Sequence, residues 1–218
     1  MRVLLFVKYP EPGKVKTRLA ARIGSEHAAG LYGAFVQDEL HMLRELGAAV
    51  TICYAPEFPE HEYAKWLPGL ELQPQRGKDL GERMLHALRE SLNKDDYVLL
   101  IGSDLPDLPF SLLCQAREAL HSAPLCFGAA ADGGFYLVAA TRSGLHSNLF
   151  RNVVWSTEHV LQTTLNNCEA LRIPVSKLPL WPDTDTLEDL QALHVRSTLA
   201  PHTRAYIRTH GLETFWNN

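Results

Sequence analysis

The stretch YVLLIGSD, residues 97–104, decides the fold class of this chain. Its first five residues form a continuous apolar run, which predicts a strand covered on both faces. Such strands are typical of α/β proteins, in which helices pack on both sides of a parallel sheet. Asp104 lies three residues past Ile101, the last residue of this strand, at the edge where open α/β sheets bind their ligands.

Similar apolar runs alternate with amphipathic stretches before this strand. We expect strands at residues 3–7, 49–54 and 70–73, and helices at about residue 17, at 25–46 and at 80–92. Asp79 is a good N-cap for the last of these helices. The alternation predicts a sheet with helices on both of its faces.

The second half of the chain is less regular. Residues 125–130 and 135–140 predict two strands joined by a hairpin, and residues 157–168, 187–196 and 206–209 predict helices. No stretch is rich enough in Gly, Ser or Pro to form a linker between domains. We therefore expect a single domain over residues 1–218.

Composition excludes several classes of protein. The formal charge is −4, with 21 Lys+Arg against 25 Asp+Glu, and there is no long basic stretch, which argues against a nucleic-acid partner. The first apolar run is too short for a signal peptide or a membrane span, so no membrane partner is expected. The four cysteines form no CxxC pair, which predicts reduced thiols in a cytoplasmic protein.

Positive charge gathers in the loop after the first predicted strand, KYPEPGKVKTR (residues 8–18). Its cations are Lys8, Lys14, Lys16 and Arg18. Pro12 and Gly13 shape the loop, and a helix that begins near Thr17 offers backbone N–H groups to an anion. Cations add charge-assisted contacts to phosphate oxygens. The loop fits neither the GxxxxGK[ST] nor the GxGxxG pattern, and a solvated basic loop is the alternative.

Acidic side chains follow two of the predicted strands. Asp104 fits a ligand of Mg²⁺, which takes carboxylate and phosphate oxygens together, but a turn or N-cap residue has the same pattern. Asp107 fits a turn residue or the cap of a helix that begins at Phe110. In PDTDT, residues 182–186, Asp183 and Asp185 precede a helix. Asp185 or Thr186 fits the cap of this helix, and the alternative for Asp185 is a second metal ligand opposite Asp104.

Two further segments have a structural and a functional interpretation. Asp132, Gly133 and Gly134 form either a hairpin turn or a place where a ligand approaches the backbone. Ser156 is expected to cap the next helix, while Trp155 is either a hydrophobic staple or a wall of an acceptor pocket.

Five motifs together resemble an uncharacterised glycosyltransferase-like (DUF2064-type) family of the nucleotide-diphospho-sugar transferase superfamily. They are FVKYPEPGKVKTRLA, GSDLPDL, AADGGFYLV, VVWSTEHVLQTTL and PDTDTLEDL. The resemblance implies a Rossmann-like three-layer α/β/α fold with a mixed, mostly parallel sheet. Relatives in the superfamily include molybdenum cofactor guanylyltransferase and phospholactate guanylyltransferase.

The resemblance also implies roles for individual residues. The nucleotide-binding residues would be Lys8, Pro12, Gly13, Lys14, Lys16, Thr17 and Arg18. Lys16, Arg18 and Asp104 would be catalytic, and Asp104 with Asp185 would bind Mg²⁺ or Mn²⁺. The acceptor would contact Asp132, Gly133, Gly134 and Trp155.

The function expected from this resemblance is Mg²⁺-dependent nucleotidyl transfer from a nucleoside triphosphate to a phosphorylated small-molecule acceptor. One alternative is a glycosyltransferase that uses a sugar nucleotide and a sugar acceptor. The loop lacks the Pro-Lys pair of the nucleotidyltransferases, and the Asp104 segment lacks the DxD of many glycosyltransferases. A second alternative is an inactive nucleotide-binding regulator.

Overall fold

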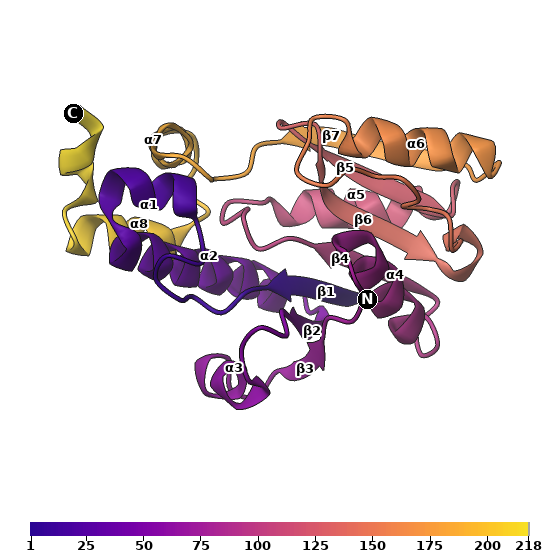
Figure 1. Cartoon of the computed structure of the whole chain (residues 1–218), viewed down its shortest axis with the longest axis horizontal. Helices are drawn as coiled ribbons and strands as arrows, with labels where there is room; N and C mark the ends of the chain where they lie inside the picture. The colour runs from indigo at the N-terminus through magenta and orange to yellow at the C-terminus, as the bar shows by residue number, and fades with distance from the viewer. Residues whose placement is uncertain (218) are drawn as a thin grey trace.

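The computed structural model describes residues 1–217 and contains a seven-stranded sheet with helices on both faces (Figure 1). The elements are, in chain order, β1 (Arg2–Val7), α1 (Thr17–Ile23), α2 (Ser25–Glu45), β2 (Ala49–Tyr54), α3 (Glu60–Trp66), β3 (Glu71–Pro74), α4 (Leu80–Ser91), β4 (Tyr97–Ile101), α5 (Phe110–Ala119), β5 (Leu125–Ala130), β6 (Phe135–Thr141), η1 (Arg142–Gly144), α6 (Val160–Ala170), β7 (Val175–Trp181), α7 (Leu187–Arg196), α8 (Pro201–Thr209) and η2 (Leu212–Asn217). None of the helices within residues 1–217 is long and apolar enough to cross a membrane.

The strands lie in the order β3-β2-β1-β4-β6-β5-β7. Strand β6 runs antiparallel to both of its neighbours, and every other pair is parallel. The sheet is therefore mixed and mostly parallel, as the sequence predicts. The carboxyl ends of β1, β2, β3 and β4 meet at one edge of the sheet.

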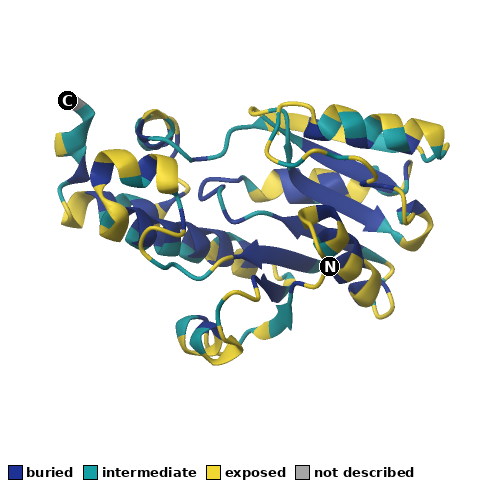
Figure 2. Ribbon diagram, viewed as in Figure 1, coloured by how far each residue is buried: buried dark blue, intermediate teal, exposed yellow. Residues whose placement is uncertain are grey.

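Alternate residues of β1 face opposite layers, as the two-residue period of a strand requires. Leu5 and Val7 pack in a core with α2 and α5, whereas Leu4 and Phe6 pack in a second core with α4 and α6. Figure 2 shows the inner strands buried along most of their length, the edge strands β3 and β7 partly exposed, and the helices exposed on their outer faces. These two cores give the three layers of the fold.

A third apolar cluster lies beyond the carboxyl end of β1, where α1, α7 and α8 gather around α2 (Figure 1). Buried Asp38 of α2 fixes α8 there: its carboxylate accepts hydrogen bonds from the His202 and Thr203 N–H groups, at 2.7 and 2.8 Å, and from the Thr203 hydroxyl, at 2.6 Å. This cluster anchors the helices that border the site.

Several predicted boundaries differ from the structure. The sequence analysis missed α3 and β7, and it began α6 three residues early and α8 five residues late. Helix α3 has only seven residues, and β7 is an edge strand that contains Pro179, which interrupts a strand pattern. The predicted N-cap of α4 is confirmed, because Asp79 accepts the Glu82 N–H at 2.8 Å.

Candidate active site

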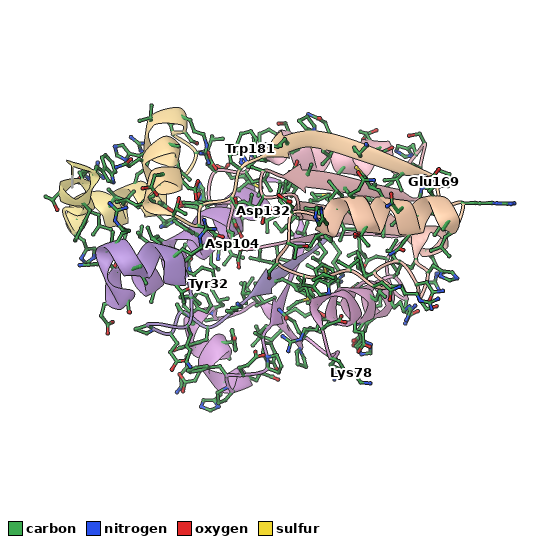
Figure 3. All side chains as sticks on the ribbon, turned by 45° about the horizontal axis from the view of Figure 1, so that its top comes forward. Tyr32, Lys78, Asp104, Asp132, Glu169 and Trp181 are labelled. Atoms are coloured by element: carbon green, nitrogen blue, oxygen red, sulfur yellow. The ribbon has the colours of Figure 1, made fainter. Side chains whose placement is uncertain are left out.

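A cavity of about 710 Å³ opens at the carboxyl ends of β1 and β4. Most of its lining comes from six segments, 6–18, 75–84, 100–105, 130–136, 155–160 and 183–185, and Tyr32, Ala55 and Glu57 complete it. Figure 3 shows Asp104 and Asp132 near the middle of the molecule, where the loops after β4 and β5 come together. This is the edge at which the sequence analysis placed the ligand.

Lys16 lies at the centre of the site. Its ammonium Nζ is 2.5 Å from Asp104 Oδ1 and 2.7 Å from Asp185 Oδ1, and it lies 5.4 Å from the centre of the Phe35 ring. Only 3% of the side chain is exposed. Burial lowers the pKa of the ammonium, but attraction by both carboxylates outweighs that effect, so its pKa is raised and the group stays charged.

Asp104 and Asp185 meet at this one ammonium although they come from distant loops. Their oxygens contact a common cation, so the pair can also approach a divalent ion. The described residues offer no group of three or more His, Cys, Asp or Glu that could hold a metal by themselves. Two carboxylates are the usual protein share of a Mg²⁺ site whose other ligands are water and phosphate. The donor set fits such an ion.

Two more carboxylates, Asp132 and Asp183, line the same cavity. Burial, followed by repulsion from Asp185 and Asp132, raises the pKa of Asp183 to about 6. The negative charge of this wall therefore exceeds what Lys16 alone can balance.

Other cations of the basic loop differ from Lys16. Lys8, Lys14 and Arg18 are exposed, line the cavity, and form no ion pair with any described residue. Lys78, from the segment before α4, joins them in the lining. Unpaired cations around a cavity favour a ligand with several negative charges.

The remaining residues of the loop have separate places. Thr17 begins α1 and lines the cavity, whereas Pro12 and Gly13 shape the turn that precedes it. Gly13 has φ +80°, and the Lys14 N–H donates to the Glu11 carbonyl at 3.0 Å. Glycine suits this turn because side chains disfavour positive φ.

One face of α2 packs against the loops that form the site, a feature that the sequence analysis missed. The Tyr32 hydroxyl accepts the Lys8 N–H at 2.9 Å and shares a 2.7 Å hydrogen bond with Ser103. Glu39 accepts the Leu105 N–H at 2.9 Å. Since residues 32, 35 and 39 lie on one helical face, α2 holds the loops after β1 and β4 together. An acidic residue on an apolar helical face is the signal that could have revealed this role.

Glu39 gives a prediction about pH. Burial, with a smaller repulsion from Asp104, raises its pKa well above the ordinary 4.5, and its Oε2 has no hydrogen-bond partner among the described residues. A carboxyl whose pKa is raised by folding stabilises the protein below about pH 4.5, and that contribution is lost as pH rises. Glu39→Gln keeps an acceptor for Leu105 without this loss.

We therefore expect Glu39→Gln to be more stable than the wild type at pH 8 and about equally stable at pH 4.5. Urea unfolding at both pH values measures the difference. A difference that does not change with pH would contradict the assignment. Glu169→Gln, the same change at an exposed position on α6, is the control.

The hairpin between β5 and β6 has a clear structural function. Gly133 has φ +86°, and a Cβ there would lie 2.2 Å from the Glu158 carbonyl oxygen. The Asp132 carboxylate accepts the Gly134 N–H at 2.9 Å. Asp132 and Gly134 line the cavity, whereas Gly133 packs its backbone against the segment before α6.

Trp155 packs and also lines the cavity. Its ring centroid lies 5.8 Å from that of Phe150 and 6.4 Å from that of Phe135, all on the α4 side of the sheet. Ser156 does not cap α6, contrary to the sequence prediction: it has φ +63°, and His159 is the N-cap. A tight turn over residues 155–159 delays the helix and turns Trp155 toward the cavity.

The structure shows whether Asp185 and Asp107 cap the helices that follow them. Thr186 caps α7 through a capping box with Asp189, so the Asp185 carboxylate is available to Lys16. Asp107 lies in a turn but does not cap α5, whose N-cap is Pro109. The buried Asp107 carboxylate instead accepts two hydrogen bonds from Arg196, at 2.9 and 3.1 Å, and ties the β4–α5 loop to α7.

Residues 39–157, more than half of the chain, match a family described as "Uncharacterized protein conserved in bacteria (DUF2064)". The chain belongs to this family. The resemblance noted in the sequence is thereby confirmed. A search of curated proteins finds no match.

Solved structures extend the comparison for this DUF2064 protein. A protein of Desulfovibrio desulfuricans G20, named as a candidate nucleotide-diphospho-sugar transferase, is 38% identical with a TM-score of 0.86, over 95% of this chain and 96% of that one. The inositol-1-phosphate CTP transferase of T. maritima is 13% identical with a TM-score of 0.61, over 94% and 96%. Rv0371C of Mycobacterium tuberculosis H37Rv, in complex with manganese, is 15% identical with a TM-score of 0.53, over 90% and 99%. These likenesses confirm the predicted fold class.

Proposed function

We propose that this protein is a transferase that moves a nucleotidyl group from a nucleoside triphosphate to a phosphorylated small-molecule acceptor. The observation that carries the proposal is the pairing of opposite charges in one cavity. Unpaired Lys8, Lys14 and Arg18 line the same cavity as the Asp104 and Asp185 carboxylates. A triphosphate with its divalent cation complements both sets of charges.

The names of similar proteins support a transferase that uses nucleotides. The T. maritima protein is a CTP transferase, and the D. desulfuricans protein is named for nucleotide-diphospho-sugar transfer. A single domain over residues 1–218 and a cytoplasmic location complete the proposal. The continuous sheet, whose strands run from Arg2 to Trp181, supports the single domain.

In this proposal the basic loop binds the nucleotide phosphates. Lys14 and Arg18 contact phosphate oxygens from the cavity mouth, and Thr17 presents the first N–H groups of α1. Asp104 and Asp185 hold Mg²⁺, or Mn²⁺ in its place, which supplies positive charge where negative charge develops during transfer. An oxygen of the acceptor phosphate attacks the α-phosphorus, and pyrophosphate leaves.

The acceptor lies against Asp132, Gly134 and Trp155. These residues line the cavity, and Gly133 shapes the hairpin that presents two of them. An aromatic ring beside carboxylates suits a sugar or polyol, whose C–H face stacks while its hydroxyls donate hydrogen bonds.

Glycosyl transfer from a sugar nucleotide is the second candidate, favoured by the name of the 38% identical relative. The two reactions break different bonds. Nucleotidyl transfer breaks a bond at the α-phosphorus, whereas glycosyl transfer breaks the bond between sugar C1 and the phosphate oxygen.

A thermal-shift panel tests the proposal. The purified protein is heated with each nucleoside triphosphate, each diphosphate and several sugar nucleotides, with and without Mg²⁺. A ligand at a hundred times its Kd adds about 2.7 kcal/mol to the free energy of unfolding, which such a scan resolves. A Mg²⁺-dependent shift with one triphosphate supports nucleotidyl transfer. A shift only with a sugar nucleotide supports glycosyl transfer, and no shift supports neither.

Arg18→Ala is expected to weaken triphosphate binding by about one to two orders of magnitude, because one charge-assisted hydrogen bond is worth roughly 1.5–3 kcal/mol. Titration calorimetry at two salt concentrations measures both the affinity and its salt dependence, which should also become weaker. Arg208→Ala removes the same charge from an exposed position on α8 and should bind normally. Equal affinities of the two variants would make the basic loop a solvated surface.

A further inference from the structure

The ammonium of Lys16 occupies the place between Asp104 and Asp185 where the proposed function needs a divalent cation. It contacts one oxygen of each carboxylate, at 2.5 and 2.7 Å. A metal ion bound to the same two oxygens would need the space that Nζ fills. Lys16 and a metal ion therefore cannot contact these two oxygens at the same time.

We propose that Lys16 is the resident counter-ion of the Asp104–Asp185 pair, and that a divalent cation binds there by displacing it. This inference rests on the metal role proposed above for the two carboxylates. It assigns Lys16 a function different from that of Lys14 and Arg18, which are free to meet phosphate from the start.

The backbone at Lys16 supports this assignment. The residue has φ +47° and ψ +46°, a left-handed conformation that costs a lysine about 1–2 kcal/mol. Such conformations persist only when the surrounding structure enforces them, and they are typical of functional sites. In this conformation the side chain lies inward, over Phe35 and between the carboxylates, whereas Lys14 and Arg18 are exposed.

A bound polyanion gives the displaced ammonium partners beyond Asp132 and Asp183, the other carboxylates of the cavity. The basic loop also contributes Lys8, Lys14 and Arg18 to the cavity wall, and all three are exposed. Since they carry the same charge as Lys16, its ammonium gains no attraction by moving among them. A nucleotide's phosphates change this, because they attract the ammonium out of the carboxylate pair. Lys has a flexible four-carbon stem, which makes such a movement possible.

Metal and nucleotide consequently bind cooperatively. In the free protein, Lys16 is ion-paired with Asp104 and Asp185, so a divalent cation binds weakly. When a nucleotide is bound, its phosphates attract the ammonium of Lys16 away from the two carboxylates, which can then bind the cation. By linkage, the metal raises the affinity for nucleotide by the same factor. The arrangement disfavours loading of the metal alone.

A titration of Mn²⁺ alone into the full-length protein tests this. Lys16→Met keeps the length of the stem and its packing on Phe35 but removes the charge. It is expected to bind Mn²⁺ at least about tenfold more tightly than the wild type, because a competing charge in direct contact with both ligands is gone. The matched control is Lys177→Met, the same change at an exposed position on β7, which should leave Mn²⁺ affinity close to that of the wild type.

In the double variant Lys16→Met with Asp104→Asn, the increase in Mn²⁺ affinity should disappear. This result would place the bound Mn²⁺ at the Asp104–Asp185 pair. If Lys16→Met binds Mn²⁺ no more tightly than the wild type, the proposal is wrong. Because no nucleotide is present, this result is independent of the nucleotide panel, and the two proposals can fail separately.

A measurement on the wild type avoids dependence on a variant that folds poorly. Lys16 is 3% exposed and should resist an amine-acylating reagent. Saturating Mn²⁺ without nucleotide should increase acylation of Lys16, quantified by mass spectrometry, and leave acylation of Lys14 unchanged. Unchanged labelling of Lys16 when Mn²⁺ is bound would overturn the proposal.

Discussion

Asp104→Ala is expected to lower turnover by at least about three orders of magnitude while the protein stays folded. The loss follows because this carboxylate is one of the two that meet at the proposed metal position. Stabilisation of charge by a metal is worth several kcal/mol, and 1.36 kcal/mol corresponds to a factor of ten in rate. The measurement is the transfer rate with the triphosphate that the nucleotide panel identifies, at several Mg²⁺ concentrations.

The fold should tolerate this change for two reasons. The Asp104 side chain is 47% exposed, and the loop is held by the backbone, whose Asp104 carbonyl accepts the Thr184 N–H at 3.0 Å. Asp96→Ala is the matched control, because it removes the same charge from an exposed residue at the other end of β4. Full activity of Asp104→Ala at low Mg²⁺ would show that Asp104 is a turn residue and not a metal ligand.

Gly133→Ala is expected to destabilise the protein by about 3 kcal/mol or more. A Cβ at this position would lie 2.2 Å from the Glu158 carbonyl oxygen and 2.6 Å from its Cα, and backbone atoms cannot yield as the end of a side chain can. The positive φ adds about 1–2 kcal/mol for any residue with a side chain. The Gly133 carbonyl also accepts the Leu161 N–H of α6 at 3.0 Å, so a displaced hairpin disturbs the start of that helix.

Urea unfolding of Gly133→Ala and Gly134→Ala measures this difference. In Gly134→Ala the new Cβ meets only the Asp132 carboxylate, at 3.0 Å, and φ lies outside the left-handed region, so we expect a much smaller loss. Comparing these two variants also distinguishes a structural hairpin turn from a place where a ligand approaches the backbone. A stable Gly133→Ala that has lost acceptor binding would favour close approach of a ligand over the structural function.

Much of the fold follows from local sequence. The apolar run of β4, the helical spacing in α2 and α4, and the turn residues between β5 and β6 each predict the observed element. Their patterns are local, since burial of one face repeats every 2 or 3.6 residues. Helix α3 and strand β7 escaped prediction because a seven-residue helix and an edge strand with Pro179 depend on what they pack against.

The candidate site divides in the same way. The sequence alone determined that Asp104 follows a buried strand, that positive charge gathers in the loop after β1, and that Thr186 or Asp185 begins a helix. These inferences needed only the rule that ligands bind at the carboxyl ends of strands.

Only the tertiary structure decided which of these charges meet. Lys16 and Asp185 are 169 positions apart, and nothing local distinguishes Lys16 from Lys14, yet one ammonium is buried between two carboxylates and the other is exposed. Buried Glu39 beneath the loop, and Asp107 paired with Arg196, likewise depend on distant partners. The physical reason is that a charge is buried only where an opposite charge or a donor meets it, and the packing of the whole chain fixes that meeting.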